Sequence, residues 1–202
     1  MAKGRHGDAE IRAALYNKKF RHFEPRSDVL VVDELGLAHA KSRVDVAVIN
    51  GTIHGYEIKS DRDTLVRFDA QLETYRQTLG RLTVVCAPRH LCHVLNDAPD
   101  WCGIIEANSG TRGAVHFTTH RSARLNPEVK PVMLAHLLWK AEAEAALSAK
   151  GLGANELRKP RIALYEMIAE LMTPKEITAL IRSAMIKRTR WRDRPIQPSC
   201  DG

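Results

Sequence analysis

No stretch of the 202 residues approaches the roughly 18 consecutive apolar residues that a membrane span needs. The first eight residues are too polar and basic for a secretory signal. Internal repeats and low-complexity segments are also missing from the sequence. We therefore expect a cytoplasmic protein that does not contact the membrane.

The sequence has few cysteines, and none of them forms a Cys-x-x-Cys pair: Cys86, Cys92, Cys102 and Cys200. Their irregular spacing predicts neither a disulfide framework nor a zinc ribbon. A zinc site that combines three of them with nearby histidines is a weak alternative, because Cys86 and Cys102 lie in apolar runs.

Positive charge exceeds negative charge, with 31 basic and 24 acidic residues, a net charge of +7 and a pI near 9.4. This balance favours an anionic partner, and nucleic acid is the natural candidate. We expect DNA, with RNA as the open alternative. Basic side chains and one tryptophan concentrate in a C-terminal run that would either grip phosphates and stack on a base or form a solvated helix end: Lys187, Arg188, Arg190, Trp191 and Arg192.

The central feature of the sequence is a predicted β-hairpin that carries Asp45, Glu57 and Lys59. In residues 43–49, Val44, Val46 and Val48 alternate with other residues, which is the period of a strand with two different faces. Asn50-Gly51 is a hairpin signal. In the second strand Glu57 and Lys59 lie two residues apart and so share a face.

The length of the turn decides whether Asp45 faces Glu57. A two-residue turn would leave these carboxylates on opposite faces of the sheet. A three-residue turn, 50–52, pairs Ile49 with Ile53 and brings the carboxylates directly opposite each other. We predict the three-residue turn, and because opposed like charges repel, we expect a cation between them.

Mg²⁺ suits this geometry because it binds oxygen ligands and takes only one or two protein carboxylates, and Mn²⁺ is its expected substitute. The predicted ligands are Asp45, Glu57 and the carbonyl oxygen of Ile58. Lys59 would orient a metal-bound water or steady a phosphate. The alternative is that Glu57 and Lys59 form only a surface ion pair. Against it, the apolar run around Asp45 makes an unpaired carboxylate costly there.

The order of Asp45 and Glu57-Ile58-Lys59 resembles the PD-(D/E)XK nuclease superfamily. Gln71 and Tyr75 are similar to the Gln-x-x-x-Tyr motif of its RecB-like and phage exonuclease branches. Val44 stands where the proline of the superfamily motif would be.

The resemblance covers residues 8–88, and the wider pattern looks like a group of small bacterial and phage proteins in this superfamily. It implies a restriction-endonuclease-like fold, a mixed central sheet flanked by helices. It also implies that Glu10 joins the metal site, although a glutamate in a first helical turn favours the helix dipole as well. Glu34 is an alternative fourth carboxylate.

The periodicities independently predict a mixed α/β sheet. In the helix expected over 64–79, Tyr75 falls on the apolar stripe and Gln71 at its margin, while Asp61 or Asp63 would cap the helix. The strand over 82–87 should be central and parallel to a neighbour, because it follows a helix and lacks polar alternation. The other expected elements are helices over 8–20 and 89–95 and strands over 29–35, 101–107 and 114–119.

The composition changes near Asn126, which predicts a core over 1–126 and a helical C-terminal region over 127–202. Helices are expected over 133–149, 161–171 and 177–187, and Thr173 begins a capping box. The last two helices would form a helix-turn-helix that reads DNA, a lid or phosphate clamp, or, as is more frequent, a hairpin that covers a core.

Together these features predict a Mg²⁺-dependent nuclease that hydrolyses DNA, endonuclease or exonuclease, in repair, phage defence or mobile-element maintenance. Asp45, Glu57, Lys59, Gln71 and Tyr75 would form its catalytic site. The alternative is a catalytically silent protein of the same fold that acts as a nucleic-acid-binding or regulatory module. An adaptor that binds a protein partner, or a homodimer, through the C-terminal helices is a third hypothesis.

Overall fold

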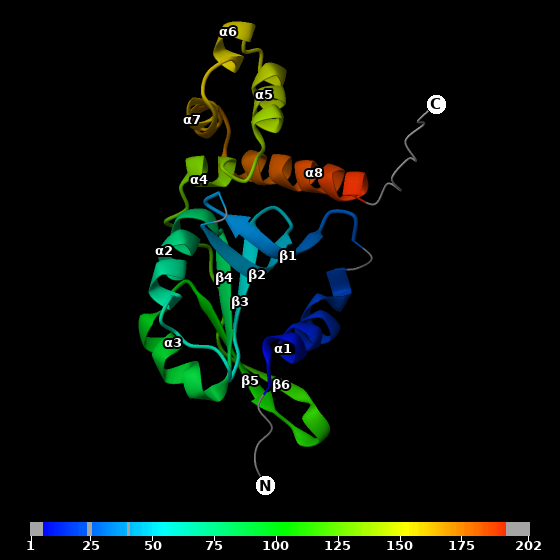
Figure 1. Cartoon of the computed structure of the whole chain (residues 1–202), viewed down its shortest axis with the longest axis vertical. Helices are drawn as coiled ribbons and strands as arrows, with labels where there is room; N and C mark the ends of the chain where they lie inside the picture. The colour runs from blue at the N-terminus through cyan, green and yellow to red at the C-terminus, as the bar shows by residue number, and fades with distance from the viewer. Residues whose placement is uncertain (1–5, 24–25, 40, 193–202) are drawn as a thin grey trace, which may run out of the picture.

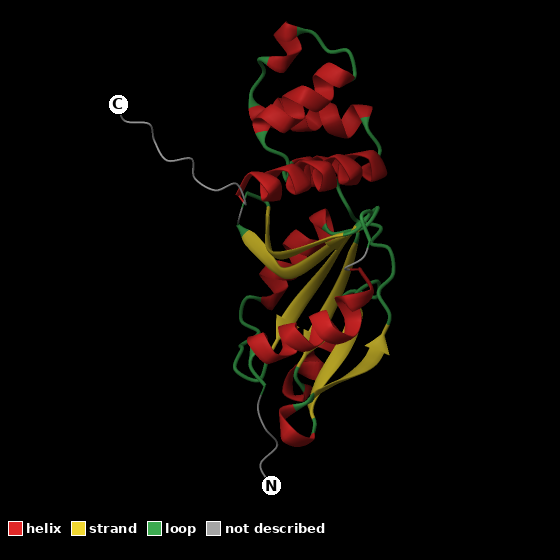
Figure 2. Cartoon of the chain, turned by 90° about the vertical axis from the view of Figure 1, so that its right-hand side faces the viewer, coloured by secondary structure: helices red, strands yellow, loops and turns green. Residues whose placement is uncertain are grey.

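A six-stranded mixed sheet, with its strands in chain order, forms the centre of the computed structural model (Figures 1 and 2). The structure describes residues 6–23, 26–39 and 41–192. The strands are β1 (Leu30–Leu37), β2 (Ser42–Ile49), β3 (Ile53–Lys59), β4 (Arg81–Cys86), β5 (Gly103–Ser109) and β6 (Val115–Arg121). β4 runs parallel to both of its neighbours, whereas the other pairs are antiparallel. The prediction of a central parallel strand is therefore confirmed.

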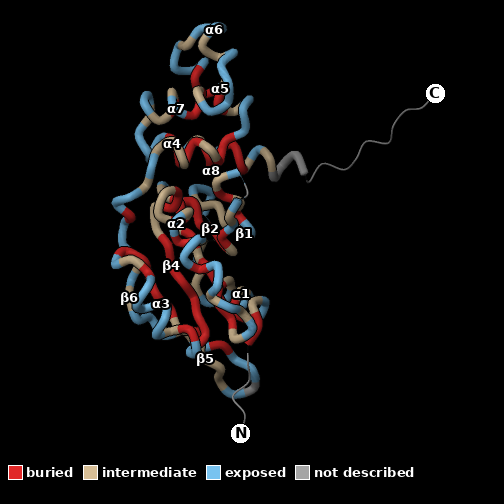
Figure 3. The backbone as a smooth tube through the Cα atoms, turned by 60° about the vertical axis from the view of Figure 1, so that its left-hand side comes forward, coloured by how far each residue is buried: buried red, intermediate tan, exposed pale blue. Residues whose placement is uncertain are grey.

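Helices cover both faces of the sheet (Figures 1 and 3). α1 (Asp8–Leu15), which continues into a π turn, packs on one face, and α2 (Phe68–Thr78) and α3 (Leu91–Asp97) pack on the other. Each face buries its own apolar cluster. The predicted mixed α/β sheet flanked by helices is thus confirmed.

The hairpin has the predicted three-residue turn. Ile49 pairs with Ile53, Gly51 has a φ of 102°, and the Asn50 N–H donates to the Thr52 carbonyl oxygen at 3.2 Å. A left-handed backbone of this kind favours glycine, which explains why the turn is placed at Asn50-Gly51.

We predict that Val44, Val46 and Val48 lie on one face of β2. The alternation is instead interrupted at Asp45. Val46 and Val48 pack under α1, but Val44 belongs to the cluster under α2. The β2–β3 ladder ends at the Val46–Tyr56 pair, and Glu34 of the adjacent strand β1 has a φ of 54°. The strands therefore part at Asp45, and the side chain before it turns to the other face.

The C-terminal helices stack at one end of the sheet (Figures 1 and 2). The helix predicted over 133–149 is two helices, because Trp139 is an extended N-cap whose N–H donates to the Glu142 carboxylate at 2.7 Å. The capping box at Thr173 is confirmed, since its N–H donates to Glu176 at 2.7 Å. The helices are α4 (Pro131–Ala135), α5 (Lys140–Ala149), α6 (Ala154–Leu157), α7 (Arg161–Leu171) and α8 (Pro174–Arg192).

α8 joins these helices to the sheet, because Ile177 and Ile181 are fully buried in the same apolar cluster as the α2 face. The helical hairpin of α7 and α8 therefore covers a core. The division at Asn126 stays a prediction. Within the described residues, no helix is long and apolar enough to cross a membrane.

Replacing Gly55 tests the packing between β3 and α2. An added Cβ would lie 2.5 Å from Leu79 Cδ1 and 3.0 Å from Val44 Cγ2. We expect Gly55→Ala to lower the free energy of unfolding by about 1–3 kcal/mol in a urea titration, because the core would be overpacked. Gly153→Ser, at the N-cap of α6, is the control and should stay within about 0.5 kcal/mol of wild type. Equal stability of both variants would contradict this packing.

Candidate functional site

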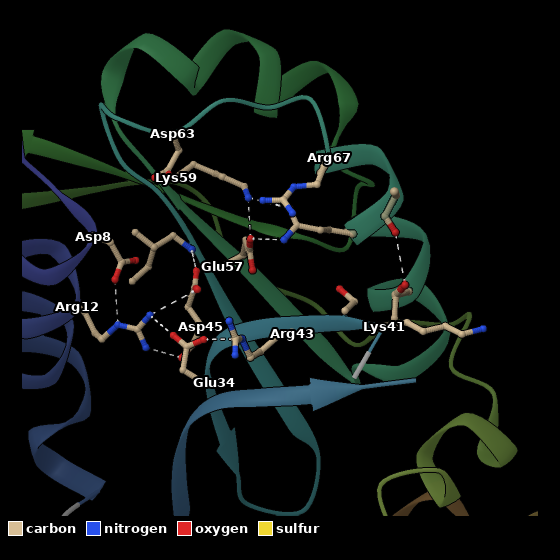
Figure 4. Close-up of a pocket in the computed structure, with 15 residues that line it drawn as sticks. Asp8, Arg12, Glu34, Lys41, Arg43, Asp45, Glu57, Lys59, Asp63 and Arg67 are labelled. Atoms are coloured by element: carbon tan, nitrogen blue, oxygen red, sulfur yellow. Dashed lines mark hydrogen bonds and ion pairs between the residues drawn. The ribbon is translucent and has the colours of Figure 1, made fainter. Parts of the chain in front are cut away.

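A cavity of about 730 Å³ opens between α1, the first three strands and the start of α2 (Figure 4). Acidic and basic side chains line it in equal number, five of each, so its formal charges cancel. They are Asp8, Arg12, Glu34, Lys41, Arg43, Asp45, Glu57, Lys59, Asp63 and Arg67. The net positive charge of the chain therefore does not come from this cavity.

The Glu57 carboxylate is the most enclosed group of the site, with 2% of the residue exposed. Lys59 Nζ donates to its Oε1 at 2.7 Å, and Gln71 Nε2 donates to the same oxygen at 2.9 Å. The Tyr75 hydroxyl donates to Oε2 at 2.6 Å. Burial, followed by the charge of Glu57, raises the pKa of Tyr75, so the hydroxyl keeps its proton. Both carboxylate oxygens thus have donors within the protein.

Lys59 is held as firmly as Glu57. Its ammonium also donates to Gln71 Oε1 at 2.8 Å and lies 5.8 Å from the centre of the Phe68 ring. These contacts come from α2, whereas Glu57 and Lys59 come from β3. The predicted residues Glu57, Lys59, Gln71 and Tyr75 therefore meet in one network that joins the sheet to the helix.

Asp45 lies beside this network, where β2 and β3 part. Its Oδ2 accepts a hydrogen bond from the Ile58 backbone N–H at 2.6 Å. The Asp45 side chain thereby accepts the Ile58 N–H beyond the point where the β2–β3 ladder ends. Burial, and then the charge of Glu57, raise the pKa of Asp45 to about 7. The two carboxylates are thus neighbours, as the hairpin register predicts.

Arg12 makes the most contacts of the cavity residues that the sequence analysis did not name, which also include Asp8, Lys41, Arg43 and Arg67. Its Nη1 donates to the Asp45 carbonyl oxygen at 2.7 Å, and its Nη2 lies 3.5 Å from Asp45 Oδ1. The guanidinium also pairs with Asp8, Asp33 and Glu34 at 3.2, 3.3 and 2.6 Å. Burial disfavours its charge, but these carboxylates outweigh burial and raise the pKa of Arg12. The sequence does contain one indication of this role, because Asp8 and Arg12 lie four residues apart on a helix and can form an ion pair.

Other predicted residues lie elsewhere or have different partners. The Glu10 carboxylate accepts the Gly7 N–H at 2.8 Å at the start of α1 and does not line the cavity. Glu34 lines it and pairs with Arg43 at 2.7 Å, as well as with Arg12. The expected helix caps are wrong: Arg67 is the N-cap of α2, and Asp63 accepts the Ser60 N–H at 2.7 Å instead.

The predicted Mg²⁺ ligands can be compared with this geometry. Asp45 and Glu57 supply two carboxylates, which is the number that Mg²⁺ commonly takes from a protein. Lys59 and Arg12 hold oxygens of these carboxylates, so an ion would have to displace donors that the protein supplies. Among the described residues, no group of three His, Cys, Asp or Glu side chains is placed to hold a metal ion. Water would have to complete the coordination of any ion bound here.

The predicted nucleic-acid-binding run lies at the end of α8. Lys187 is exposed, whereas Arg188 pairs with Glu142 and donates to the Leu137 carbonyl oxygen at 3.1 Å. The side chains of the remaining three predicted residues lie outside the part of the chain that the structure describes: Arg190, Trp191 and Arg192.

Fold and site together define a mixed α/β protein. Neighbouring basic and polar groups bond the two carboxylates of its central hairpin, Asp45 and Glu57. The chain belongs to the bacteriophage P4 protein cII family, whose model matches residues 1–194. It is similar to Protein cII of Enterobacteria phage P4, with 27% identity over 163 residues, which cover 80% of this chain. The chain spans 60% of the length of that relative. No solved structure matches.

These comparisons overturn the functional prediction made from the hairpin motif. The family is that of phage P4 protein cII and not the PD-(D/E)XK nucleases, so the assignment of a nuclease, a hydrolase and a Mg²⁺-dependent deoxyribonuclease was wrong. The motif of Asp45, Glu57 and Lys59 is present, but it does not identify that superfamily here. The alternative of a regulatory protein fits these findings better than a nuclease does.

The raised pKa of Asp45 predicts how stability depends on pH. The folded carboxyl group keeps its proton up to about pH 7, above its ordinary pKa of 3.8. The folded state therefore binds more protons than the unfolded state between these values, and the contribution of Asp45 to stability falls as pH rises through them. Asp45→Asn should gain stability relative to wild type by a few kcal/mol between pH 4 and 7, about 1.4 kcal/mol for each pKa unit.

Urea unfolding of both proteins at several pH values measures this difference. Effects of titrating groups that do not interact with Asp45 cancel in the comparison of the two proteins. A difference that stays constant from pH 4 to 8 would contradict the raised pKa.

Proposed function

We propose that this protein binds nucleic acid, with DNA as the expected partner, and acts in regulation by occupying it and not by cleaving it. A cytoplasmic location is part of the proposal. The observation that carries it is the distribution of charge: the acid–base cavity is balanced, whereas the C-terminal region is basic. Residues 127–202 contain 13 basic and 9 acidic residues.

Exposed cations in this region have few internal partners, which supports phosphate binding. Lys175 and Lys187 are exposed on α8, and Arg158 and Lys159 are exposed on the connection between α6 and α7. Phosphate contacts by such side chains release counterions and supply affinity without reading sequence. Membership of a phage protein family is consistent with a partner of this kind.

The hydrogen bonding of the central site supports a structural role for it. A lysine that assists phosphodiester cleavage needs its ammonium free to meet a water or a phosphate. Lys59 instead donates to Glu57 and Gln71 and is 8% exposed. Its charge is thus used to balance a buried carboxylate.

The proposal predicts DNA binding without cleavage. Wild type should retard both plasmid and linear DNA on a gel and leave them intact with Mg²⁺, Mn²⁺ or EDTA. Binding should weaken steeply as salt rises, because released counterions drive it. Asp45→Ala and Lys59→Ala serve as matched controls for a trace nuclease contaminant.

Metal-dependent cleavage by wild type that both variants lose would contradict the proposal. Absence of any gel shift at low salt would contradict it as well.

Binding of Mg²⁺, with Mn²⁺ as its substitute, at Asp45 and Glu57 stays a prediction, and we propose it as a structural site. An ion there would relieve the repulsion that helps to raise the pKa of Asp45. An ion at about ten times its Kd should add about 1.4 kcal/mol of stability, since it binds the folded state only. Thermal melts with rising Mg²⁺ should show a higher Tm for wild type and no change for Asp45→Asn. Equal responses of the two proteins would place the ion elsewhere.

A further inference from the structure

A second cavity of about 480 Å³ lies between the end of β1, the α4–α5 connection, α7 and α8. We call it the junction pocket. Its volume falls within the range of about 300–1,000 Å³ that small-molecule sites occupy. Among the described residues that line it there is no Asp or Glu, but there are four aromatic or imidazole rings and three cationic side chains: His39, His136, Trp139, Tyr165, Lys140, Arg161 and Arg188.

Three of the four rings, those of His39, His136 and Tyr165, pack against one another. The His39 and His136 ring centres lie 4.5 Å apart at 30°, and His136 lies 4.9 Å from Tyr165. Tyr165 is fixed because its hydroxyl donates to the Leu138 carbonyl oxygen at 2.6 Å. Trp139 is 55% exposed, which is unusual for so large an apolar side chain. Flat rings on a fixed base are suited to stacking against a nucleobase.

Arg188 holds the indole in place and leaves part of it open. Its guanidinium carbon lies 4.2 Å from the centre of the Trp139 ring. The same guanidinium pairs with Glu142, so its charge is already balanced inside the protein. Arg188 therefore orients Trp139 and is not the cation that an anionic ligand would meet.

Arg161 is the cation suited to that role. It is the first residue of α7, a helix with no acidic residue in its first turn. The positive end of a helix dipole disfavours a cation, and Arg161 has no ion-pair partner among the described residues. Burial, and then the charges of Arg161 and Lys41, lower the pKa of His39. The His39 imidazole therefore stays neutral. Because Arg161 has no ion-pair partner, a bound anion would supply the negative charge that balances it.

The backbone before the pocket is strained. Ala38 has a φ of 48° and His39 a φ of 58°, and residues other than Gly, Asn, Asp and His rarely adopt such values, so the strain lies at Ala38. Such conformations persist where the surrounding structure holds them, and they concentrate at ligand sites. This backbone leads directly into His39, whose ring lies against His136.

We propose that the junction pocket binds one unpaired nucleotide of a single strand. Its base stacks on Trp139 and His39, and its phosphate pairs with Arg161. The inference rests on the proposed function and adds to it a preference for single-stranded or locally opened nucleic acid.

Fluorescence anisotropy with two probes tests this inference: a labelled oligothymidylate of about eight nucleotides and a duplex that carries the same label. Arg161→Gln should weaken oligothymidylate binding about tenfold, because it removes the phosphate partner. His39→Asn should weaken it similarly, and asparagine tolerates the positive φ. Arg161→Lys keeps the positive charge and should bind the oligothymidylate within about threefold of wild type.

Arg21→Gln is the matched control, because it makes the same change at an exposed arginine that lies outside the C-terminal region and does not line the pocket. It should change oligothymidylate binding by less than about twofold. Duplex binding should change by less than about twofold in all four variants. Thermal melts establish that each variant is folded.

The possible failures can be told apart. If wild type binds both probes, and if Arg161→Gln and His39→Asn bind the oligothymidylate as tightly as Arg21→Gln does, the junction pocket is not the site and the proposed function stands. If folded wild type binds neither probe at low salt, both the inference and the proposed function are wrong.

Discussion

The buried pair of Glu57 and Lys59 is the interaction on which the rest of the structure depends. Both residues lie on β3 and project toward α2, where only 2% of Glu57 and 8% of Lys59 is exposed. Removing two charges from water costs several kcal/mol each, so the pair is tolerated only where further hydrogen bonds complete it. Gln71 and Tyr75 provide those bonds from one face of α2. The buried pair is therefore fully hydrogen-bonded only when α2 packs in this position against the sheet.

The parting of β2 and β3 at Asp45 follows from the same arrangement. Two carboxylates directly opposed in a regular ladder would repel each other. In this protein the ladder ends one pair earlier, and Asp45 bonds the Ile58 N–H with its side chain. The carbonyl group of Asp45, which the ladder leaves free, accepts from Arg12 of α1. One local departure from strand geometry thus helps to dock α1 on its face of the sheet.

Much of this fold could be predicted from local sequence. The Asn50-Gly51 signal and the two alternating runs defined the hairpin register, and the apolar run over 82–87 defined the central strand. The reversal at Val44 could not be predicted, because it arises from long-range contacts of Asp45. Nor could the helix break at Trp139, since a tryptophan N-cap has no side-chain acceptor to reveal it.

The site itself was only partly predictable. The spacing placed Glu57, Lys59, Gln71 and Tyr75 together, but the same spacing serves either an open catalytic centre or a closed network. Arg12 lies far away in sequence, and its contacts with Asp33, Glu34 and Asp45 depend on the tertiary fold. The functional assignment failed for this reason: the motif describes which residues meet and not whether their charges are free to act. Family membership, and not the motif, corrected it.

The central claim, that Glu57 and Lys59 stabilise each other as a closed structural pair, is tested most directly by a double-mutant cycle. Urea unfolding of wild type, Glu57→Gln, Lys59→Met and the double variant gives their coupling free energy. We predict a favourable coupling of about 1–3 kcal/mol, with the double variant more stable than the sum of the single losses implies. A coupling indistinguishable from zero would contradict the account.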